Sequence, residues 1–424
     1  MRKLTSNLVS KIAKDQFFSA TFWMFLGLGF MNVGNYLYHL LMGRMLGVSL
    51  YGALESIISA LYILSVPTLT LNLVIVKYVA SYKGRGENES IYGLYNYILR
   101  LLLIFGLLIS VIFVIISPFI QKFLHLPSIT LALLLPLGFF INLFYFLNKS
   151  LLQGISSFFK LSMLNFIEAL VKLLSAILLV YLGYKVEGAY GAVIVSIVLA
   201  SVVSAFYIKD IVKIHLTSTV KYLHGRDLLK FSLPTFITSL SLISIFTTDV
   251  ILVRHFFPGA DSGYYSALSV LGKIVYFAAA PIVLVLFPMI SEHHARGESY
   301  RRLLILGTSF TLLIAGFITL VFFFAPEFMV LLLFGTKYLV IANMLGMFGI
   351  FVSLLSLSSL FANFYLSIHR TVPSFFVGGA AILQIILITF FHKTIAEIIW
   401  ISITVTFLLL ILLLLYYPHA TSNK

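Results

Sequence analysis

Cysteine is missing from this 424-residue chain, which excludes disulfides, thiolate metal sites and cysteine nucleophiles and leaves the redox compartment undetermined. Charge is scarce as well, because only 10% of the residues are charged, against about 25% in soluble domains. Hydrophobic residues make up 61% of the chain. This composition excludes a water-soluble globular fold.

The chain also lacks the signatures of soluble enzymes. It has no phosphate-binding glycine loop, no nucleotide-binding domain and no His-Glu-x-x-His zinc motif. We therefore expect no enzymatic activity, no cofactor and no metal site, and transport would have to depend on a gradient or on a coupled pathway. The formal charge of +14 does not indicate a nucleic-acid partner, since no binding module is present and the charge lies in short loops.

Long apolar runs follow one another from end to end of the chain. A run of about 18 or more such residues can cross the ~30 Å hydrocarbon core of a bilayer as a helix. The first run is too long for a signal-peptide core and has no small-residue cleavage site, so we expect it to be retained. Hydropathy and turn signals predict twelve spans, at 17–41, 54–79, 91–117, 129–152, 158–182, 188–208, 229–253, 263–290, 303–325, 339–366, 372–391 and 395–417.

Positive charge alternates between successive loops. If the N-terminus is inside, most Lys and Arg residues lie in segments predicted to be cytoplasmic. The outer segments hold only Arg44, Lys122, Lys185, Arg254, Lys337 and Lys393. Positive residues favour the cytoplasmic side, and a missing or extra span would invert the pattern downstream. We therefore expect a multi-pass protein of the cytoplasmic membrane with both termini in the cytoplasm.

The two halves of the chain share a short pattern. Segment 83–87 (Lys-Gly-Arg-Gly-Glu), after the second predicted span, matches segment 294–298 (His-Ala-Arg-Gly-Glu), after the eighth. If the match is not chance, each half contains six spans and enters the membrane from the same side. This predicts an all-α membrane protein of about 12 transmembrane helices, in two six-helix parallel-repeat lobes around a central cavity. The predicted domains are an N-terminal lobe at 1–208, a cytoplasmic linker at 209–228 and a C-terminal lobe at 229–424.

A few ionisable residues lie inside predicted spans, where each costs about 2.5 to 3.5 kcal/mol unless it faces a cavity or a partner. The candidates for such a role are Arg100, Glu168, Lys172, Asp249 and Lys273. Lys273 has no acid within one helical turn and lies far from either interface, which favours a cavity. Together the three basic and two acidic groups indicate a basic cavity, which favours an anion such as a phosphate or pyrophosphate.

Local pairing is the alternative for several of these residues. Glu168 and Lys172, spaced i, i+4, could neutralise each other on one helical face. Asp249 could form an outer latch with Arg254 or act as a gate or proton-responsive group. Arg100 could extend toward the inner headgroups instead of facing a cavity.

The first predicted span is unusually polar for a membrane helix. Its glycines and asparagines, Asn35 among them, suit either close helix packing or the wall of a water-filled cavity. Pro67 and Pro281 occupy roughly corresponding places in the two halves, and Pro-interrupted helices at matched positions indicate a central site in repeat transporters. Packing alone also places prolines in membrane helices.

Several segments carry a resemblance to a known family. Segments 45–52 (Met-Leu-Gly-Val-Ser-Leu-Tyr-Gly), 77–80 leading into 85–87, and 263–267 running on to 286–291 resemble the Wzx-type polysaccharide-biosynthesis flippases. These belong to the multidrug/oligosaccharidyl-lipid/polysaccharide exporter superfamily. The resemblance covers essentially the whole chain in span number and lobe arrangement, and its motifs are short and mostly structural.

The resemblance implies an alternating-access flippase that moves an undecaprenyl-pyrophosphate-linked or similar lipid-linked oligosaccharide across the membrane for surface polysaccharide biosynthesis. Lys273 lies where the related lipid II flippases carry a cavity cation for the pyrophosphate. The predicted substrate-binding residues are Lys273, Arg100, Lys172 and Asn35. The residues predicted to couple H+ or Na+, or to gate, are Asp249, Glu168, Arg254, Pro67 and Pro281. The first span has no arginines and no thirteenth or fourteenth helix is predicted, which disfavours lipid II itself.

Two other functions remain as alternatives. A cation-coupled multidrug exporter of the same superfamily would need acids to dominate the cavity, and the two interior acids leave this open. A membrane-embedded glycan polymerase would be expected to carry large outer loops with catalytic groups, whereas the outer loops predicted here are short. Membrane lipids and glycan-assembly enzymes are the further partners that a flippase implies.

Overall fold

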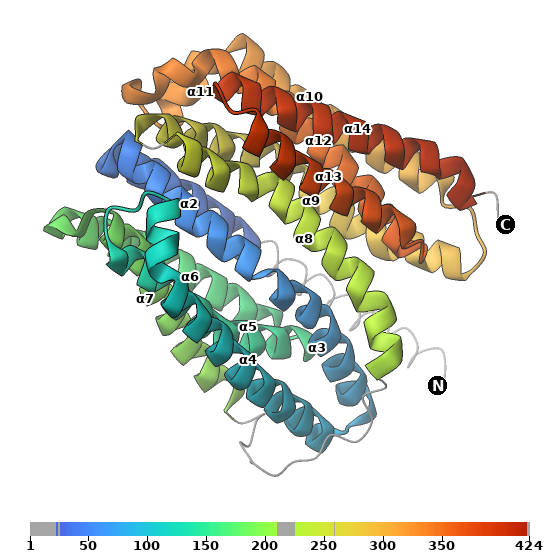
Figure 1. Ribbon diagram of the computed structural model, residues 1–424. Coiled ribbons are helices and arrows are strands. Elements are labelled where there is room, and N and C mark those ends of the chain that lie inside the picture. Colours follow the sequence, from blue (N-terminus) through green and yellow to red (C-terminus); the bar gives the residue numbers. More distant parts are fainter. Residues whose placement is uncertain (1–22, 24–25, 210–224, 258, 422–424) are drawn as a thin grey trace. The chain divides into compact units, whose positions relative to one another are not determined.

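The computed structural model describes residue 23 and residues 26–209, 225–257 and 259–421, and every regular element within these ranges is a helix (Figure 1). The first helical stretch occupies residues 26–46. The elements after it are α2 (Val48–Leu64), α3 (Val66–Arg85), α4 (Asn88–Phe123), α5 (Ile129–Gly154), α6 (Phe158–Leu179), η1 (Val180–Tyr184), α7 (Lys185–Ile208), α8 (Gly225–Phe256), α9 (Ala260–Ala295), α10 (Arg301–Phe324), α11 (Pro326–Leu333), η2 (Thr336–Ile341), α12 (Ala342–Ser367), α13 (Val372–Phe390) and α14 (Ile395–Thr421).

The helices reproduce the predicted spans. Ten helical runs in the described residues are long and apolar enough to cross a membrane. One of them, residues 158–208, contains both α6 and α7, and the helical stretch 26–46 overlaps the first predicted span. The prediction of about twelve spanning helices is therefore confirmed. The sequence did not predict the short helix α11 or the 3-10 turn η2 that precedes α12.

The 51-residue run reverses direction at a single glycine. Gly183 has φ +93° and interrupts the helical backbone between α6 and α7, a conformation that glycine adopts without strain. Lys185 follows at φ +46°. Helices α6 and α7 then pack against each other, so this run crosses the membrane twice.

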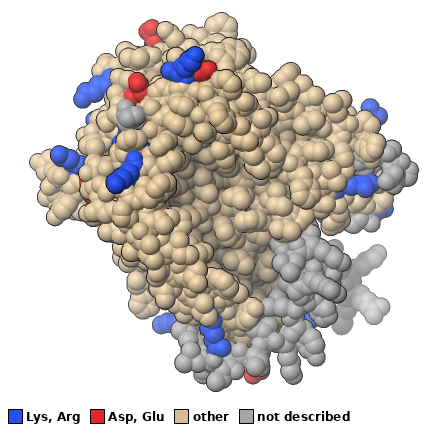
Figure 2. All heavy atoms as spheres, viewed as in Figure 1, with Lys and Arg blue, Asp and Glu red and all other residues tan. Residues whose placement is uncertain are grey.

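Apolar side chains cover the outside of the helices. On α4, Ile104, Ile115 and Phe119 are each more than half exposed, and on the face drawn in Figure 2 charged side chains are few and separated by broad uncharged stretches. Exposure on this scale would be unfavourable in water, because monomeric soluble proteins rarely present large apolar patches. It suits contact with lipid chains.

Packing divides the chain into two compact units. Unit 1 comprises residues 1–42, 68–120 and 128–224, and unit 2 comprises residues 43–67, 121–127 and 225–424. Helix α2, from the second predicted span, packs on α8 and α9 and therefore belongs to unit 2. Most of the predicted linker, residues 210–224, lies outside the described residues. The predicted division into lobes at the centre of the sequence stays a prediction.

The second span is broken where the two units meet along the chain. Helix α2 ends at Leu64 and α3 begins at Val66, and the unit boundary falls after Pro67. Proline lacks the N–H that would continue the helical hydrogen bonds. Just before it, both the N–H and the hydroxyl of Ser65 donate to the Leu61 carbonyl, at 3.0 and 2.8 Å. Pro281, at the matched position, lies inside the continuous helix α9, so the predicted interruption of that helix is wrong.

The internal repeat is visible in the backbone. Gly86 and Gly297 both have φ +72°, and each closes a turn with the same two hydrogen bonds. The glycine N–H donates to the carbonyl of the residue three positions earlier. The N–H of the glutamate that follows donates to the carbonyl of the residue five positions before that glutamate. Gly47 and Gly259, which precede α2 and α9, also share positive φ angles, of +76° and +88°. Equal turns at matched positions support the parallel six-helix repeats that the sequence predicted.

Candidate substrate site

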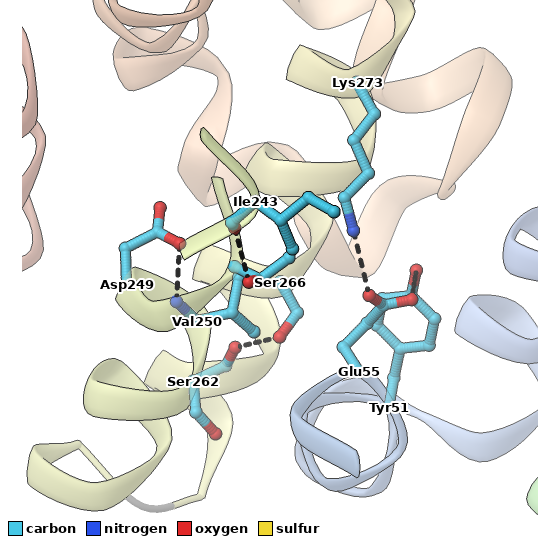
Figure 3. Close-up of polar contacts among 9 residues, drawn as sticks. Tyr51, Glu55, Ile243, Asp249, Val250, Ser262, Ser266 and Lys273 are labelled. Atoms are coloured by element: carbon cyan, nitrogen blue, oxygen red, sulfur yellow. Dashed lines mark hydrogen bonds and ion pairs between the residues drawn. The ribbon is translucent and has the colours of Figure 1, made fainter. Parts of the chain in front are cut away.

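Lys273 forms an ion pair inside unit 2. Its ammonium nitrogen lies 3.5 Å from Glu55 Oε2, and the two side chains are only 7% and 0% exposed (Figure 3). Glu55 also accepts a hydrogen bond of 3.4 Å from the Tyr51 hydroxyl. The sequence placed no acid near Lys273, because Glu55 comes from α2, which is distant along the chain.

Two glycines let α2 and α9 approach closely enough for this pair. A Cβ atom on Gly263 would lie 1.9 Å from the Val48 carbonyl oxygen, and one on Gly52 would lie 2.7 Å from the Gly263 nitrogen. Glu55 follows Gly52 by one helical turn and therefore shares its face. Lys273 follows Gly263 by about three turns, and its long stem extends toward Glu55 (Figure 3).

Aromatic rings surround the lysine. The ammonium of Lys273 lies 5.6 Å from the ring centroids of both Tyr62 and Phe246. Such contacts stabilise a cation by about 0.5 to 2 kcal/mol, depending on how far it is desolvated. Lys273 itself is 5% exposed, whereas Tyr62 is 42% exposed, so one of the two rings reaches the surface of unit 2.

Asp249 is a second buried acid beside this pair. It is 1% exposed and accepts hydrogen bonds from the Tyr265 hydroxyl at 2.7 Å and from the Val250 N–H at 2.8 Å. It also attracts Lys273 electrostatically. We call Glu55, Asp249, Tyr265 and Lys273 the Lys273 cluster. With two carboxylates and one ammonium, its formal charge is negative.

The alternative that Asp249 and Arg254 form a latch is wrong. Arg254 instead donates to four acceptors within unit 2, which are Leu124 O at 2.8 Å, His125 O at 2.6 Å, Ser49 O at 3.3 Å and Ser262 Oγ at 2.8 Å. Arginine has five N–H donors in a fixed fork, which suits several backbone carbonyls better than one distant carboxylate. Arg254 therefore links the loop between α4 and α5 to the first turns of α2 and α9 by hydrogen bonds.

Unit 1 contains a separate charged cluster around Lys172. The ammonium of this residue on α6 donates to Asn35 Oδ1 in the first helical stretch and lies 5.2 Å from the Tyr38 ring centroid. Two predicted substrate-binding residues are thus brought together. The close contact of the two helices depends on Gly34, because a Cβ there would lie 2.7 Å from the Ala169 Cβ.

Glu168 does not take Lys172 as its ion-pair partner. Its Oε2 accepts a hydrogen bond of 2.7 Å from the Tyr145 hydroxyl and lies 3.7 Å from the Lys149 ammonium on α5. Glu168 also attracts Lys172 electrostatically, but partners on neighbouring helices reach both groups, so the alternative in which the two satisfy each other alone is wrong. We call Asn35, Tyr145, Lys149, Glu168 and Lys172 the Lys172 cluster. Its formal charge is positive, with two lysines and one carboxylate.

The remaining predicted site residue is Arg100. It lies on α4 with an exposed side chain, within unit 1. Its place in a binding site stays a prediction, as does the division of roles between all the candidate residues. Sequence reasoning missed Glu55, Lys149 and Tyr265, although an acid inside the second predicted span was a signal that could have found Glu55.

The fold defines a class, the multi-span helical membrane proteins. The chain is similar to an inward-facing multidrug resistance MATE transporter at TM-score 0.76 and 14% identity, over 95% of this chain and 99% of that one. It is similar to the lipid II flippase MurJ, inward closed, at TM-score 0.71 and 16% identity, over 94% and 87%. A superfamily transporter from Pyrococcus furiosus matches at TM-score 0.64 and 15% identity, over 96% of each.

A family model described as polysaccharide biosynthesis protein matches residues 41–343. The chain therefore belongs to this polysaccharide biosynthesis family, and the resemblance noted from the sequence is confirmed. No curated protein matches the chain by sequence. The solved structures similar to it are transporters and a flippase, at identities that establish the fold alone.

Proposed function

We propose that the protein is an alternating-access flippase for a lipid-linked oligosaccharide, whose carrier is undecaprenyl pyrophosphate or a similar lipid. Membership of the polysaccharide biosynthesis family supports this substrate class. In this proposal the protein lies in the cytoplasmic membrane with both termini inside and works beside glycan-assembly enzymes. Transport then moves the head group from the inner to the outer leaflet.

The observation that carries the proposal is the excess of lysine in the Lys172 cluster. Lys149 and Lys172 face a single carboxylate, Glu168, within spanning helices. A lone cation is costly at bilayer depth, so an uncompensated one is retained where an anion binds. Lysine is a common phosphate ligand, acting as a point charge. We assign the pyrophosphate to Lys172, with Asn35 orienting the ammonium and Arg100 contributing further positive charge. Lys273, in unit 2, is proposed as a separate substrate-binding residue.

The acidic excess of the Lys273 cluster suits ion coupling. Two carboxylates share one lysine there, so one uptake of H+ or Na+ would neutralise the cluster. We propose Asp249 as the coupling group, with Glu168 adjusting the charge of the other cluster. Arg254, Pro67 and Pro281 are proposed to gate, with the helix break before Pro67 acting as a bending point between units.

A multidrug exporter is the second candidate, because the acidic Lys273 cluster would also suit a cationic cargo. Reconstitution into proteoliposomes distinguishes the two. A flippase makes a pyrophosphate-linked oligosaccharide in the inner leaflet accessible to an external lectin, and does not accumulate rhodamine 6G. Dye transport without lectin accessibility would contradict the proposal.

A further inference from the structure

Lys273 and Arg254, the two buried cations among the described side chains of unit 2, differ in how many of their N–H donors form hydrogen bonds. Arg254 makes four hydrogen bonds of 2.6 to 3.3 Å and is fixed in place. Lys273 meets no acceptor with hydrogen-bond geometry among the described residues, although its nitrogen is fully buried. Its ion-pair partner within the described part of the chain, Glu55, lies at 3.5 Å, beyond the 2.7 to 2.9 Å typical of a charge-assisted hydrogen bond.

A buried ammonium whose N–H donors form no hydrogen bonds can bind another anion. Lysine carries three donors, and a pair with Glu55 at this distance commits none of them strongly. Tyr62, which flanks the nitrogen, is 42% exposed, so displacement of this ring is the route that we propose for a ligand. Tyr51 would remain as a hydrogen-bond donor to Glu55 when the lysine turned away.

We propose that Glu55 is an internal competitor for the substrate's phosphate. Its carboxylate neutralises Lys273 while no substrate is bound, and the pyrophosphate oxygens of the head group displace it during transport. This role rests on the proposed function, within which Glu55 would set the affinity for the substrate. A site that binds pyrophosphate very tightly would release it slowly. A carboxylate that pairs with Lys273 raises the apparent Kd, because only the fraction of molecules with an unpaired lysine can bind the ligand.

The test is equilibrium binding of radiolabelled geranylgeranyl pyrophosphate to the purified full-length chain in detergent. Geranylgeraniol serves as the uncharged control ligand. If Glu55 holds Lys273 in about nine of ten molecules, Glu55→Gln should tighten binding about tenfold. Glu327→Gln, which removes an exposed carboxylate of unit 2 on α11, should leave binding unchanged.

A second variant covers the possibility that Glu55→Gln does not fold. Glu55→Asp keeps the charge but withdraws the carboxylate by one methylene, so it should tighten binding by a smaller factor, between the wild type and Glu55→Gln. Thermal unfolding in detergent shows which variants are folded. Unchanged or weaker binding in the folded variants overturns the role of Glu55.

The two proposals fail in distinguishable ways. If the wild type binds geranylgeranyl pyrophosphate no better than geranylgeraniol, the proposed function fails and the role of Glu55 fails with it. If the wild type binds the pyrophosphate selectively but neither Glu55 variant binds it more tightly, only the role of Glu55 is lost.

Discussion

The Lys172 cluster and the Lys273 cluster are opposite in charge and unequal in enclosure. In unit 1, Lys149 and Glu168 are 28% and 21% exposed, and lysine is in excess. In unit 2, Lys273 and Glu55 are 7% and 0% exposed, and carboxylate is in excess. A sum of the formal charges of both clusters hides this separation, because the positive excess of one cluster cancels the negative excess of the other. In our proposals the open, basic cluster binds an anion directly, whereas the closed, acidic one responds to a cation and binds an anion only when Glu55 is displaced from Lys273.

The largest expected effect is on stability, through Lys273→Met. The change leaves Glu55 and Asp249 buried without their cation, and breaking a buried pair costs about 3 to 5 kcal/mol. Unfolding in detergent, followed by temperature or denaturant, measures the loss. The double variant Glu55→Gln/Lys273→Met should recover much of it. A single variant as stable as the wild type would show that the lysine does not balance these acids.

A smaller effect is expected from Gly263→Ala, which tests the helix contact that creates the enclosed cluster. The new Cβ would lie 1.9 Å from the Val48 carbonyl oxygen, so α2 and α9 must separate. Overpacking of this kind costs about 1 to 3 kcal/mol. Gly191→Ala is the control, since nothing lies within 4 Å of the Cβ it would add. Equal unfolding temperatures for the two variants would contradict the close contact.

The next prediction compares the loss of stability when the hydrogen-bonding tyrosine of each cluster is replaced by phenylalanine. Tyr265→Phe removes the hydrogen bond to the fully enclosed Asp249, and Tyr145→Phe removes the one to Glu168, which keeps Lys149. Hydrogen bonds to charged groups contribute about 1.5 to 3 kcal/mol, and solvent reduces this for Glu168. Tyr265→Phe should therefore be the more destabilising in the same unfolding measurement. The reverse order would contradict the difference in enclosure.

Much of the fold could be predicted because local chemistry determines it. Each span is long and apolar enough to be read in isolation, and the glycine turns at Gly86 and Gly297 repeat in sequence as they do in backbone angle. The reversal at Gly183 also lies where the hydropathy falls. The short helix α11 was missed because its eight residues continue an apolar run.

Less of the candidate site could be predicted, because its contacts join distant parts of the chain. Spacing along one helix suggested that Glu168 pairs with Lys172, whereas Lys149 and Asn35 come from other helices. Glu55 lies close to the start of its helix, and only the packing of α2 against α9 brings it beside Lys273. Sequence identifies which charges enter the membrane, and tertiary packing decides which of them are neutralised.

The most direct test of the central claim is head-group translocation by Lys172→Met in proteoliposomes. The account predicts that lectin accessibility of a pyrophosphate-linked oligosaccharide falls at least about tenfold, which corresponds to ~1.4 kcal/mol of lost interaction, while the protein stays folded. Lys160→Met, which removes a lysine bonded to the Tyr207 carbonyl outside both clusters, should transport like the wild type. Undiminished translocation by folded Lys172→Met would contradict the assignment of the anion to the basic cluster.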